Sequence, residues 1–356
     1  MPEDAVTAEG LRRQFASDNY AGICPEAWEA MAAANVGHAP SYGDDPWTER
    51  ACNRIRELFE TDCDVFFTFN GTAANSLAVS VLCKPYHSIL VHETAHLETD
   101  ECGAPEFFSN GTKVLVVPGT EGKLDLAAVE HAVRRRTDIH YPRPRAISVT
   151  QATELGTVYT AAEVGAVGET ARRLGLRVHM DGARLANALA TLQVAPKDLT
   201  WKAGVDVLCL GGVKNGLAFG EAVVFFDRAL AEEFDFRCKQ AGQLGAKMRF
   251  FAAAWAGVLE TGAWLRNAAH ANECARRLEE RLRRCPQVRV MFPREANSVF
   301  VEMPEAVAAG LRALGWRFYT FIGCGGSRLM CSWDTTADDI DALTRDLHSL
   351  LVDKVR

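Results

Sequence analysis

LRVHMDGARLANAL (residues 176–189) and VDVLCLGGVKNGLAFGEAVVFF (residues 205–226) are the stretches that decide the fold. Each begins with a short apolar run that is typical of a buried strand. Charged side chains follow where the chain leaves the predicted sheet: Asp181 and Arg184 after the first run, and Lys214 after the second. Open α/β sheets hold their ligands at such strand ends. We therefore expect a ligand site where these two strands end.

These three side chains have the chemistry that pyridoxal 5'-phosphate (PLP) requires. A lysine amine binds the cofactor aldehyde covalently, and a carboxylate keeps the pyridine nitrogen protonated so that the ring withdraws electrons. An arginine offers a planar fork to a carboxylate or a phosphate. The simpler alternative is that Asp181 caps the following helix and Lys214 is an ordinary loop lysine.

Strand-like and helix-like segments alternate along most of the chain. The predicted strands lie at 64–69, 88–93, 112–119, 145–159, 176–181, 205–212 and 221–226. The helices predicted by apolar spacing or composition lie at 46–60, 76–83, 123–136, 160–175 and 182–192. Thr160 with Glu163 forms a capping box before one of them. This order predicts an α/β fold with a mainly parallel, seven-stranded sheet covered by helices, in which 221–226 runs antiparallel.

Changes in composition divide the chain into three parts. Residues 1–46 contain a short helix at 25–35 and a Gly/Pro/Tyr-rich turn, and we expect an N-terminal arm that lies on a neighbouring subunit. Residues 47–255 form the large domain. Long helices begin near residue 227, and basic residues of the 237–249 region are candidates to reach a phosphate across an interface. Residues 256–356 are predicted to form a small α+β domain.

Composition excludes several classes of protein. The 356 residues include 39 basic and 46 acidic residues, a net charge of -7, and no basic stripe, so no nucleic-acid partner is expected. Eleven cysteines occur without a CxxC pair, which favours free thiols in a reducing compartment. No signal-like or membrane-spanning run is present, and we expect a cytoplasmic protein without membrane contact.

A strand followed by a Gly-Thr turn and a helix occurs at FNGTAAN (residues 69–75). The start of a helix offers backbone N–H groups and a positive dipole to an anion. We therefore take Gly71, Thr72 and Ala73 as the candidate phosphate-binding residues. The pattern alone has low specificity, and it is neither a P-loop nor a dinucleotide fingerprint.

The segment HETAH (residues 92–96) matches the H-E-x-x-H zinc motif. That motif requires both histidines on one helix and a third ligand, but His92 closes a predicted strand and no third ligand is evident. We therefore expect no metal site, although a zinc hydrolase stays an alternative to be tested. His96 is instead a candidate to lie against the cofactor ring, or else it bonds a loop carbonyl. Arg328, in SRLMCSW, is a candidate carboxylate ligand, the alternative being a solvent-facing strand residue.

Taken together, these segments resemble the fold-type I PLP-dependent enzymes, and most closely the low-specificity L-threonine aldolases and L-phenylserine aldolases. The resemblance spans nearly the whole chain and rests on matching blocks, of which MDGAR followed by the lysine turn is the most specific. The blocks are SDNYAG at 17, YGDD at 42, FNGTAAN at 69, HETAHLETDECGAPEFF at 92, QATELGTVYT at 151, HMDGARLANAL at 179, GGVKNG at 211, RCKQAGQLGAKMRF at 237 and SRLMCSW at 327.

The resemblance implies a role for each candidate residue. Lys214 would bind PLP covalently, Asp181 would contact the pyridine nitrogen, His96 would stack on the ring, and Gly71 and Thr72 would bind the phosphate. The substrate carboxylate would be bound by Ser17, Arg184 and Arg328, with Tyr42 contributed by a neighbouring subunit. The family also implies retro-aldol cleavage of L-threonine, L-allo-threonine or L-phenylserine to glycine and an aldehyde, with His96 as the candidate base, and a homotetramer (a dimer of dimers) with shared active sites.

Two departures from the family pattern limit this transfer. Many relatives carry a histidine shortly after the strand at 146–153, whereas this chain has Thr153 and Glu154. The lysine turn reads GGVKNG instead of the SKGLGAP type. Three alternatives therefore stay open: β-elimination or transamination on PLP, zinc hydrolysis, and a non-catalytic oligomeric scaffold.

Overall fold

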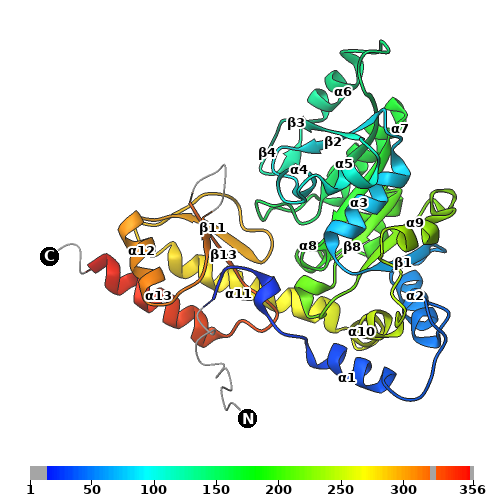
Figure 1. Ribbon diagram of the computed structural model, residues 1–356. Coiled ribbons are helices and arrows are strands. Elements are labelled where there is room, and N and C mark those ends of the chain that lie inside the picture. The colour runs from blue at the N-terminus through cyan, green and yellow to red at the C-terminus, as the bar shows by residue number, and fades with distance from the viewer. Residues whose placement is uncertain (1–13, 321–325, 353–356) are drawn as a thin grey trace.

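The computed structural model describes residues 14–320 and 326–352 (Figure 1). Residues 1–13 of the predicted arm, and most of the glycine-rich turn that precedes Arg328, lie outside the described residues. The large and small domains lie side by side in Figure 1, and the long helix α11 (Ala263–Leu282) runs between them.

The large domain contains one seven-stranded sheet in the order β1-β9-β8-β7-β6-β2-β3. Its strands are β1 (Asp64–Thr68), β2 (His87–His92), β3 (Lys113–Val117), β6 (Arg143–Thr150), β7 (Arg177–Gly182), β8 (Val207–Leu210) and β9 (Glu221–Phe225). The five strands from β8 to β3 pair in parallel. β9 is antiparallel to both β8 and β1. The seven-stranded, mainly parallel sheet and its antiparallel strand are therefore confirmed.

Helices cover both faces of this sheet because successive strand residues alternate between two apolar layers. Val207 and Cys209 face the core formed with α3 (Gly71–Leu82) and α9 (Phe234–Gln240). Leu208 and Leu210 face the larger core on the opposite side. That core includes α2 (Pro46–Phe59), α6 (Leu126–Arg134), α7 (Ala161–Leu174), α8 (Leu185–Leu192) and α10 (Arg249–Glu260). The result is a three-layer α/β/α domain.

Local sequence explains where the helices begin. Asp45 accepts hydrogen bonds from the first turn of α2, with Pro46 at its first position. The capping box of Thr160 and Glu163 opens α7, as predicted. The predicted turn at 70–75 is wrong in one respect: because Asn70 caps the helix, α3 already begins at Gly71.

The strand predicted over 145–159 is also too long. β6 ends at Thr150, and Gln151 then pairs through its side-chain amide with the backbone of Tyr159. This pairing closes residues 151–159 into a loop, which a pattern of apolar residues does not reveal. A two-strand hairpin, β4 (Gly119–Thr120) and β5 (Lys123–Leu124), lies beside it.

The small domain has its own four-stranded antiparallel sheet in the order β10-β11-β13-β12. Its elements are β10 (Arg289–Val290), β11 (Ser298–Glu302), α12 (Glu305–Ala313), β12 (Tyr319–Thr320), β13 (Ser327–Met330) and α13 (Ala337–Val352). The small core contains Phe15 from the N-terminal segment, together with residues of α11 from Cys274 onward.

The predicted boundary between residues 255 and 256 falls within α10. Trp255, Val258 and Trp264 all belong to the core of the large domain, whereas Cys274 and Leu278 belong to the small core. The three-part division stays a prediction. In the structure, the start of α11 packs in the core of the large domain and its later residues pack in the small core. The N-terminal segment is shared in the same way, because Cys24 and Ala27, the latter in α1 (Pro25–Ala34), pack in the large core.

Ten cysteines lie in the described residues, all of them unpaired and all but Cys102 buried, in line with the expectation of free thiols. No helix in this part of the chain combines the length and the apolar character needed to cross a bilayer.

Candidate active site

The predicted ligand site lies where β7 and β8 end. Asp181 pairs with Cys209 and Gly182 with Leu210, so the two strands finish side by side. The chain then turns through Gly211 and Gly212 into a short 3-10 helix, Val213–Asn215, that carries Lys214. A Cβ atom on Gly211 would lie 2.3 Å from the carbonyl oxygen of Ala183, so this backbone approach requires glycine.

Asp181 is buried, with 4% of its surface exposed, and its carboxylate is held on both oxygens. Oδ1 accepts a hydrogen bond from the Ala183 N–H (3.0 Å), and Oδ2 accepts one from Asn75 Nδ2 (2.9 Å). Burial raises the pKa of Asp181, but the positive charges of His96 and Lys214, together with these hydrogen bonds, lower it overall. An ionised, fixed carboxylate of this kind suits a protonated ring nitrogen.

Lys214 is partly buried, and it lies in a turn whose backbone is hydrogen-bonded to the side chain of Glu221. Glu221 Oε2 accepts hydrogen bonds from the N–H groups of Gly212 (2.6 Å) and Val213 (3.4 Å). Burial and the charge of Arg184 lower the pKa of Lys214. Among the described residues Lys214 forms no ion pair, and an amine whose pKa is lowered would suit the role of a nucleophile.

His96 begins the short helix α4 (His96–Thr99) and is held by two carboxylates. Its Nδ1 contacts Glu101 Oε1 at 2.8 Å, and its backbone N–H donates to Glu154 Oε1 at 2.9 Å. Asn75 Nδ2 donates to Glu101 Oε1 as well as to Asp181, so polar contacts run from Asp181 to His96. Sequence analysis named His96 and Asp181 as candidates, and it did not name Asn75 or Glu101, which the fold brings into contact with them.

The two histidines of the zinc-like motif do not share a helix. His92 ends β2, is buried, and contacts the Thr94 hydroxyl through Nδ1 at 2.9 Å, whereas His96 starts α4. Across residues 14–320 and 326–352, no group of three His, Cys, Asp or Glu side chains is placed to hold a metal ion.

The candidate phosphate-binding residues open α3. Asn70 Oδ1 accepts the Ala73 N–H at 2.9 Å, so the backbone donor of Ala73 is already engaged by the helix cap. Within the described residues, the N–H groups of Gly71 and Thr72 make no hydrogen bond. Two unpaired donors at the start of a twelve-residue helix fit a phosphate.

The candidate substrate residues come from both domains. Arg184 makes a two-pronged ion pair with Asp18, from Nε to Oδ2 (2.7 Å) and from Nη2 to Oδ1 (2.9 Å). Arg328 donates from Nη2 to the carbonyl oxygen of Ala16 (3.1 Å), while its Nε is buried without a hydrogen-bond partner among the described residues. Arg328 therefore has more unused donor capacity for a carboxylate than Arg184 has.

The other two candidate substrate residues, Ser17 and Tyr42, make no hydrogen bond with Arg328 among the described residues. Ser17 caps a 3-10 helix, Asp18–Tyr20, by accepting the Asn19 N–H at 3.1 Å, next to the ion pair of Asp18. Tyr42 lies at the surface with Lys239 Nζ 4.4 Å from its ring centroid, and its backbone bonds to Ala246. None of these contacts joins Tyr42 to the other candidates.

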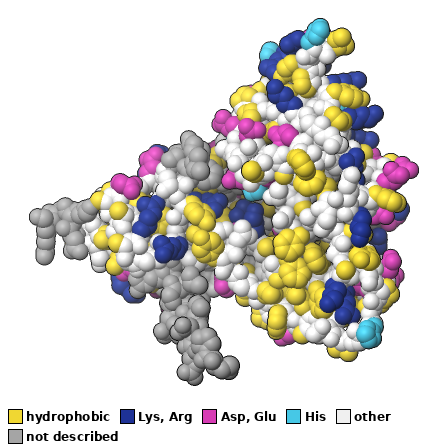
Figure 2. Space-filling model, in the orientation of Figure 1, with side chains coloured by type: hydrophobic (Ala, Val, Ile, Leu, Met, Phe, Trp, Pro, Cys, Tyr) yellow, Lys and Arg dark blue, Asp and Glu magenta, His cyan; other side chains and the backbone are white. Residues whose placement is uncertain are grey.

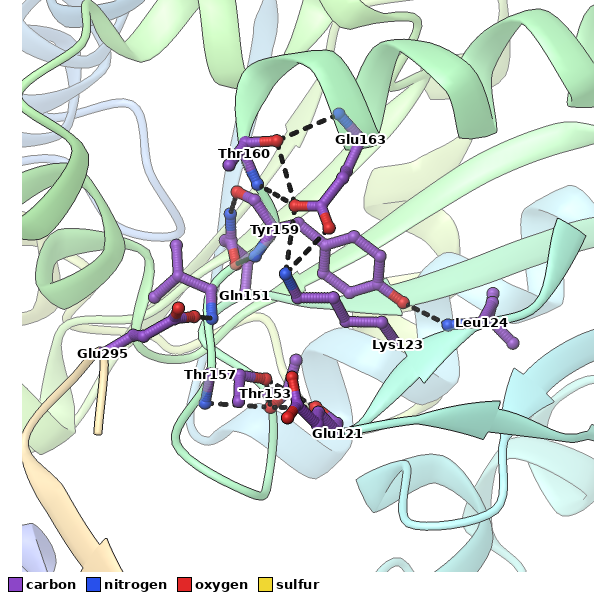
Figure 3. Close-up of polar contacts among 11 residues, drawn as sticks. Glu121, Lys123, Leu124, Gln151, Thr153, Thr157, Tyr159, Thr160, Glu163 and Glu295 are labelled. Atoms are coloured by element: carbon purple, nitrogen blue, oxygen red, sulfur yellow. Dashed lines mark hydrogen bonds and ion pairs between the residues drawn. The ribbon is translucent and has the colours of Figure 1, made fainter. Parts of the chain in front are cut away.

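The loop that follows β6, of which Glu154 is part, is held by several hydrogen bonds, and Figure 3 shows those around Thr153, Thr157 and Glu295. Thr153 and Thr157 bond to each other through their hydroxyls at 2.7 Å, and Thr157 also bonds to the carbonyl oxygen of Glu121. Glu295, between β10 and β11 of the small-domain sheet, accepts the Val158 N–H at 2.7 Å. The loop that carries Glu154 is thus held by contacts with both domains. Burial and the negative charge of Asp181 raise its pKa to about 7.

Comparisons with known proteins agree with this geometry. A family model described as beta-eliminating lyase matches residues 14–306. The low specificity L-threonine aldolase of Pseudomonas aeruginosa is 60% identical over 339 residues, which cover 95% of this chain and 98% of that protein. The Saccharomyces cerevisiae enzyme of the same name is 28% identical over 308 residues, covering 86% of this chain and 77% of its own.

Solved structures give the same picture. The Leishmania major threonine aldolase superposes with a TM-score of 0.88 at 29% identity, covering 95% of this chain and 98% of that one. The Burkholderia pseudomallei sphingosine-1-phosphate lyase superposes with a TM-score of 0.70 at 16% identity, covering 95% and 85% of the two chains, which supports the fold alone.

Proposed function

Because this chain belongs to the beta-eliminating lyase family, and within it to the low-specificity L-threonine aldolases, we propose that it cleaves L-β-hydroxy-α-amino acids to glycine and an aldehyde. The substrate class includes L-threonine, L-allo-threonine and L-phenylserine. The observation that carries the proposal is the 60% identity across nearly the full length of both chains, joined to a lysine and a buried carboxylate at neighbouring strand ends.

The residues at the strand ends fit PLP, the cofactor of this family. Lys214 would hold it covalently, Asp181 would pair with its ring nitrogen, His96 would lie against its ring, and the unpaired N–H groups of Gly71 and Thr72 would bind its phosphate. When bound, PLP supplies an electron-withdrawing ring that stabilises negative charge at the substrate α-carbon. Asp181 is ionised for this task because its pKa is lowered.

The side chains of the chain itself select and orient the substrate. Arg328, with its unpartnered Nε, would bind the substrate carboxylate, and Ser17 and Arg184 would complete that pocket. Arg184 has only part of its fork available, because Asp18 occupies Nε and Nη2. Removing the proton of the β-hydroxyl group requires a base, and His96 is the candidate.

Product analysis tests this proposal directly. We expect purified enzyme with PLP to release equimolar glycine and aldehyde from L-threonine and L-phenylserine. The second candidate, favoured by the family description, is β-elimination, which would release ammonia and a keto acid instead. Keto acid without aldehyde would reject the aldolase and support the eliminating lyase or an aminotransferase.

A homotetramer in the cytoplasm with shared active sites is part of the same proposal. Phe69, Phe219 and Phe251 form an aromatic cluster around the start of α10, and Figure 2 shows hydrophobic side chains gathered on that face. Tyr42 is also exposed, as a residue offered to a neighbouring subunit would be. Light scattering should give four times the chain mass of 39.0 kDa.

A further inference from the structure

Glu101 is a buried carboxylate for which the proposed reaction so far gives no role. Its side chain is 0% exposed, and one oxygen, Oε1, takes both of its contacts: His96 Nδ1 at 2.8 Å and Asn75 Nδ2 at 2.8 Å. The other oxygen, Oε2, is buried without a partner among the described residues. Such a costly arrangement calls for a reason beyond packing.

Hydrogen-bond chemistry fixes the state of the His96 ring. An ionised carboxylate only accepts hydrogen bonds, so Nδ1 must carry a proton for its contact with Glu101 to be favourable. In the neutral ring the lone pair then lies on Nε2. Within the described residues Nε2 makes no hydrogen bond, and the side chain is 36% exposed. Nε2 is therefore the ring atom available to accept a proton from a ligand.

The charges around the ring adjust its basicity. Burial alone lowers the pKa of His96, but the hydrogen bond that Nδ1–H donates to Glu101 and the charge of Asp181 raise it overall, against an opposing effect of Lys214. Glu154 faces the backbone of His96, where it accepts the N–H. Burial raises the pKa of Glu101 itself.

The following inference rests on the proposed function and deepens it. We propose that Glu101 is a positioning residue that holds His96 with Nδ1–H towards its carboxylate, so that Nε2 accepts the β-hydroxyl proton of the substrate. As that proton moves to Nε2, the electron pair of the O–H bond becomes the second bond of the aldehyde carbonyl. The electrons of the broken Cα–Cβ bond remain with the carbon that becomes the α-carbon of glycine.

The test compares Glu101→Gln with a matched control, Glu98→Gln, which lies on the short helix α4 that carries His96. Glutamine keeps the size of the side chain but loses its charge, whereas Glu98 is exposed and makes no hydrogen bond through its side chain among the described residues. Glu101→Gln should lower kcat for L-phenylserine about 10- to 100-fold. It should also move the acid limb of the pH profile to lower pH by about one unit, because His96 loses its anionic partner. Glu98→Gln should change neither.

Two further measurements keep the inference separate from the proposed function. Nitrogen-15 NMR of the His96 ring, assigned with a His96→Gln variant, should show the proton on Nδ1 in the neutral ring whatever reaction the enzyme catalyses. Glycine affinity should be the same in Glu101→Gln and the parent, because glycine has no β-hydroxyl group. A Glu101→Gln enzyme with an unchanged acid limb, or a parent ring protonated on Nε2 alone, would overturn the inference. If Glu101→Gln does not fold, the inference is tested by the pH profile of Glu101→Asp and by the nitrogen-15 signals of the His96 ring in the parent enzyme.

Discussion

The two halves of the site are built in different ways. In the half that would hold the cofactor, Asp181 and Lys214 follow adjacent strands of one sheet, and Asn75 and Glu221 fix them from neighbouring elements of the same domain. In the half that would hold the substrate, Asp18 from the N-terminal segment meets Arg184 of the large domain and Asn297 of the small domain. Sheet register thus determines the first half, whereas the second depends on how the two domains meet.

The halves also differ in how their charges are satisfied. Asp181 makes hydrogen bonds with neutral groups, and Lys214 has no ion pair among the described residues, so both remain available. Arg184 is committed to a buried ion pair, which lowers the pKa of Asp18 even though burial alone raises it. Breaking such a pair is costly because it leaves a buried charge without a partner. In the described part of the chain, the charged groups of the cofactor half, Asp181 and Lys214, are therefore free of ion pairs and can interact with a ligand, whereas the ion pair of the substrate half serves mainly to hold the two domains and the substrate pocket in place.

The largest effect is expected from Lys214→Ala in the cofactor half. Without the amine the enzyme loses its covalent hold on PLP, and aldehyde release should fall by at least about 10³-fold. Circular dichroism should stay unchanged, because Lys214 has no ion pair among the described residues. Full turnover by this variant would remove the assignment.

Asp181→Asn should come next. The amide keeps the size of the side chain but cannot stay ionised against a protonated ring, and the loss of this preorganised charge should lower kcat about 10²- to 10³-fold. Steady-state kinetics with saturating PLP would measure it. An effect on KM alone would mean that Asp181 serves binding and not electron withdrawal.

The substrate half is expected to respond less strongly and in a different parameter. Arg328→Lys loses the planar fork and should raise KM about 10- to 100-fold, in line with one or two charged hydrogen bonds. Arg184→Lys keeps the charge but cannot make both hydrogen bonds of the two-pronged ion pair with Asp18, so its main effect should be a lower thermal midpoint. If Arg184→Lys raised KM more than Arg328→Lys at unchanged stability, the comparison of the two arginines would be reversed.

The smallest effect concerns Glu154 and the pH dependence of stability. Its pKa of about 7 in the folded protein lies above the ordinary value of 4.5, so between these pH values the folded protein retains a proton that the unfolded chain releases. This contribution is fully present below pH 4.5 and is lost as pH rises through about 7. Glutamine does not titrate, so Glu154→Gln should gain stability relative to the parent between pH 5 and pH 8, by on the order of 2 kcal/mol. Urea unfolding of cofactor-free protein at both pH values would measure this, and a parallel pH dependence in the two proteins would contradict it.

Sequence reasoning worked best where local pattern and fold coincide. The strand ends that carry Asp181 and Lys214, the antiparallel β9 and the capping box of α7 are all visible as apolar runs, turns or caps. It failed where a contact joins distant residues. Glu101 lies only five residues after His96 but resembles any acidic residue of a polar loop, and the fold is needed to join it to Asn75, 26 residues away. The pairing of Asp18 with Arg184 spans two segments that no spacing rule connects.

The central claim is that the amine of Lys214 binds the cofactor opposite Asp181. Borohydride reduction of the enzyme with PLP, followed by peptide mass mapping, tests it most directly. We predict the pyridoxyl mass on the peptide that contains Lys214, and loss of this label when glycine is added in excess before reduction. A label on another lysine, or none at all, would contradict the claim.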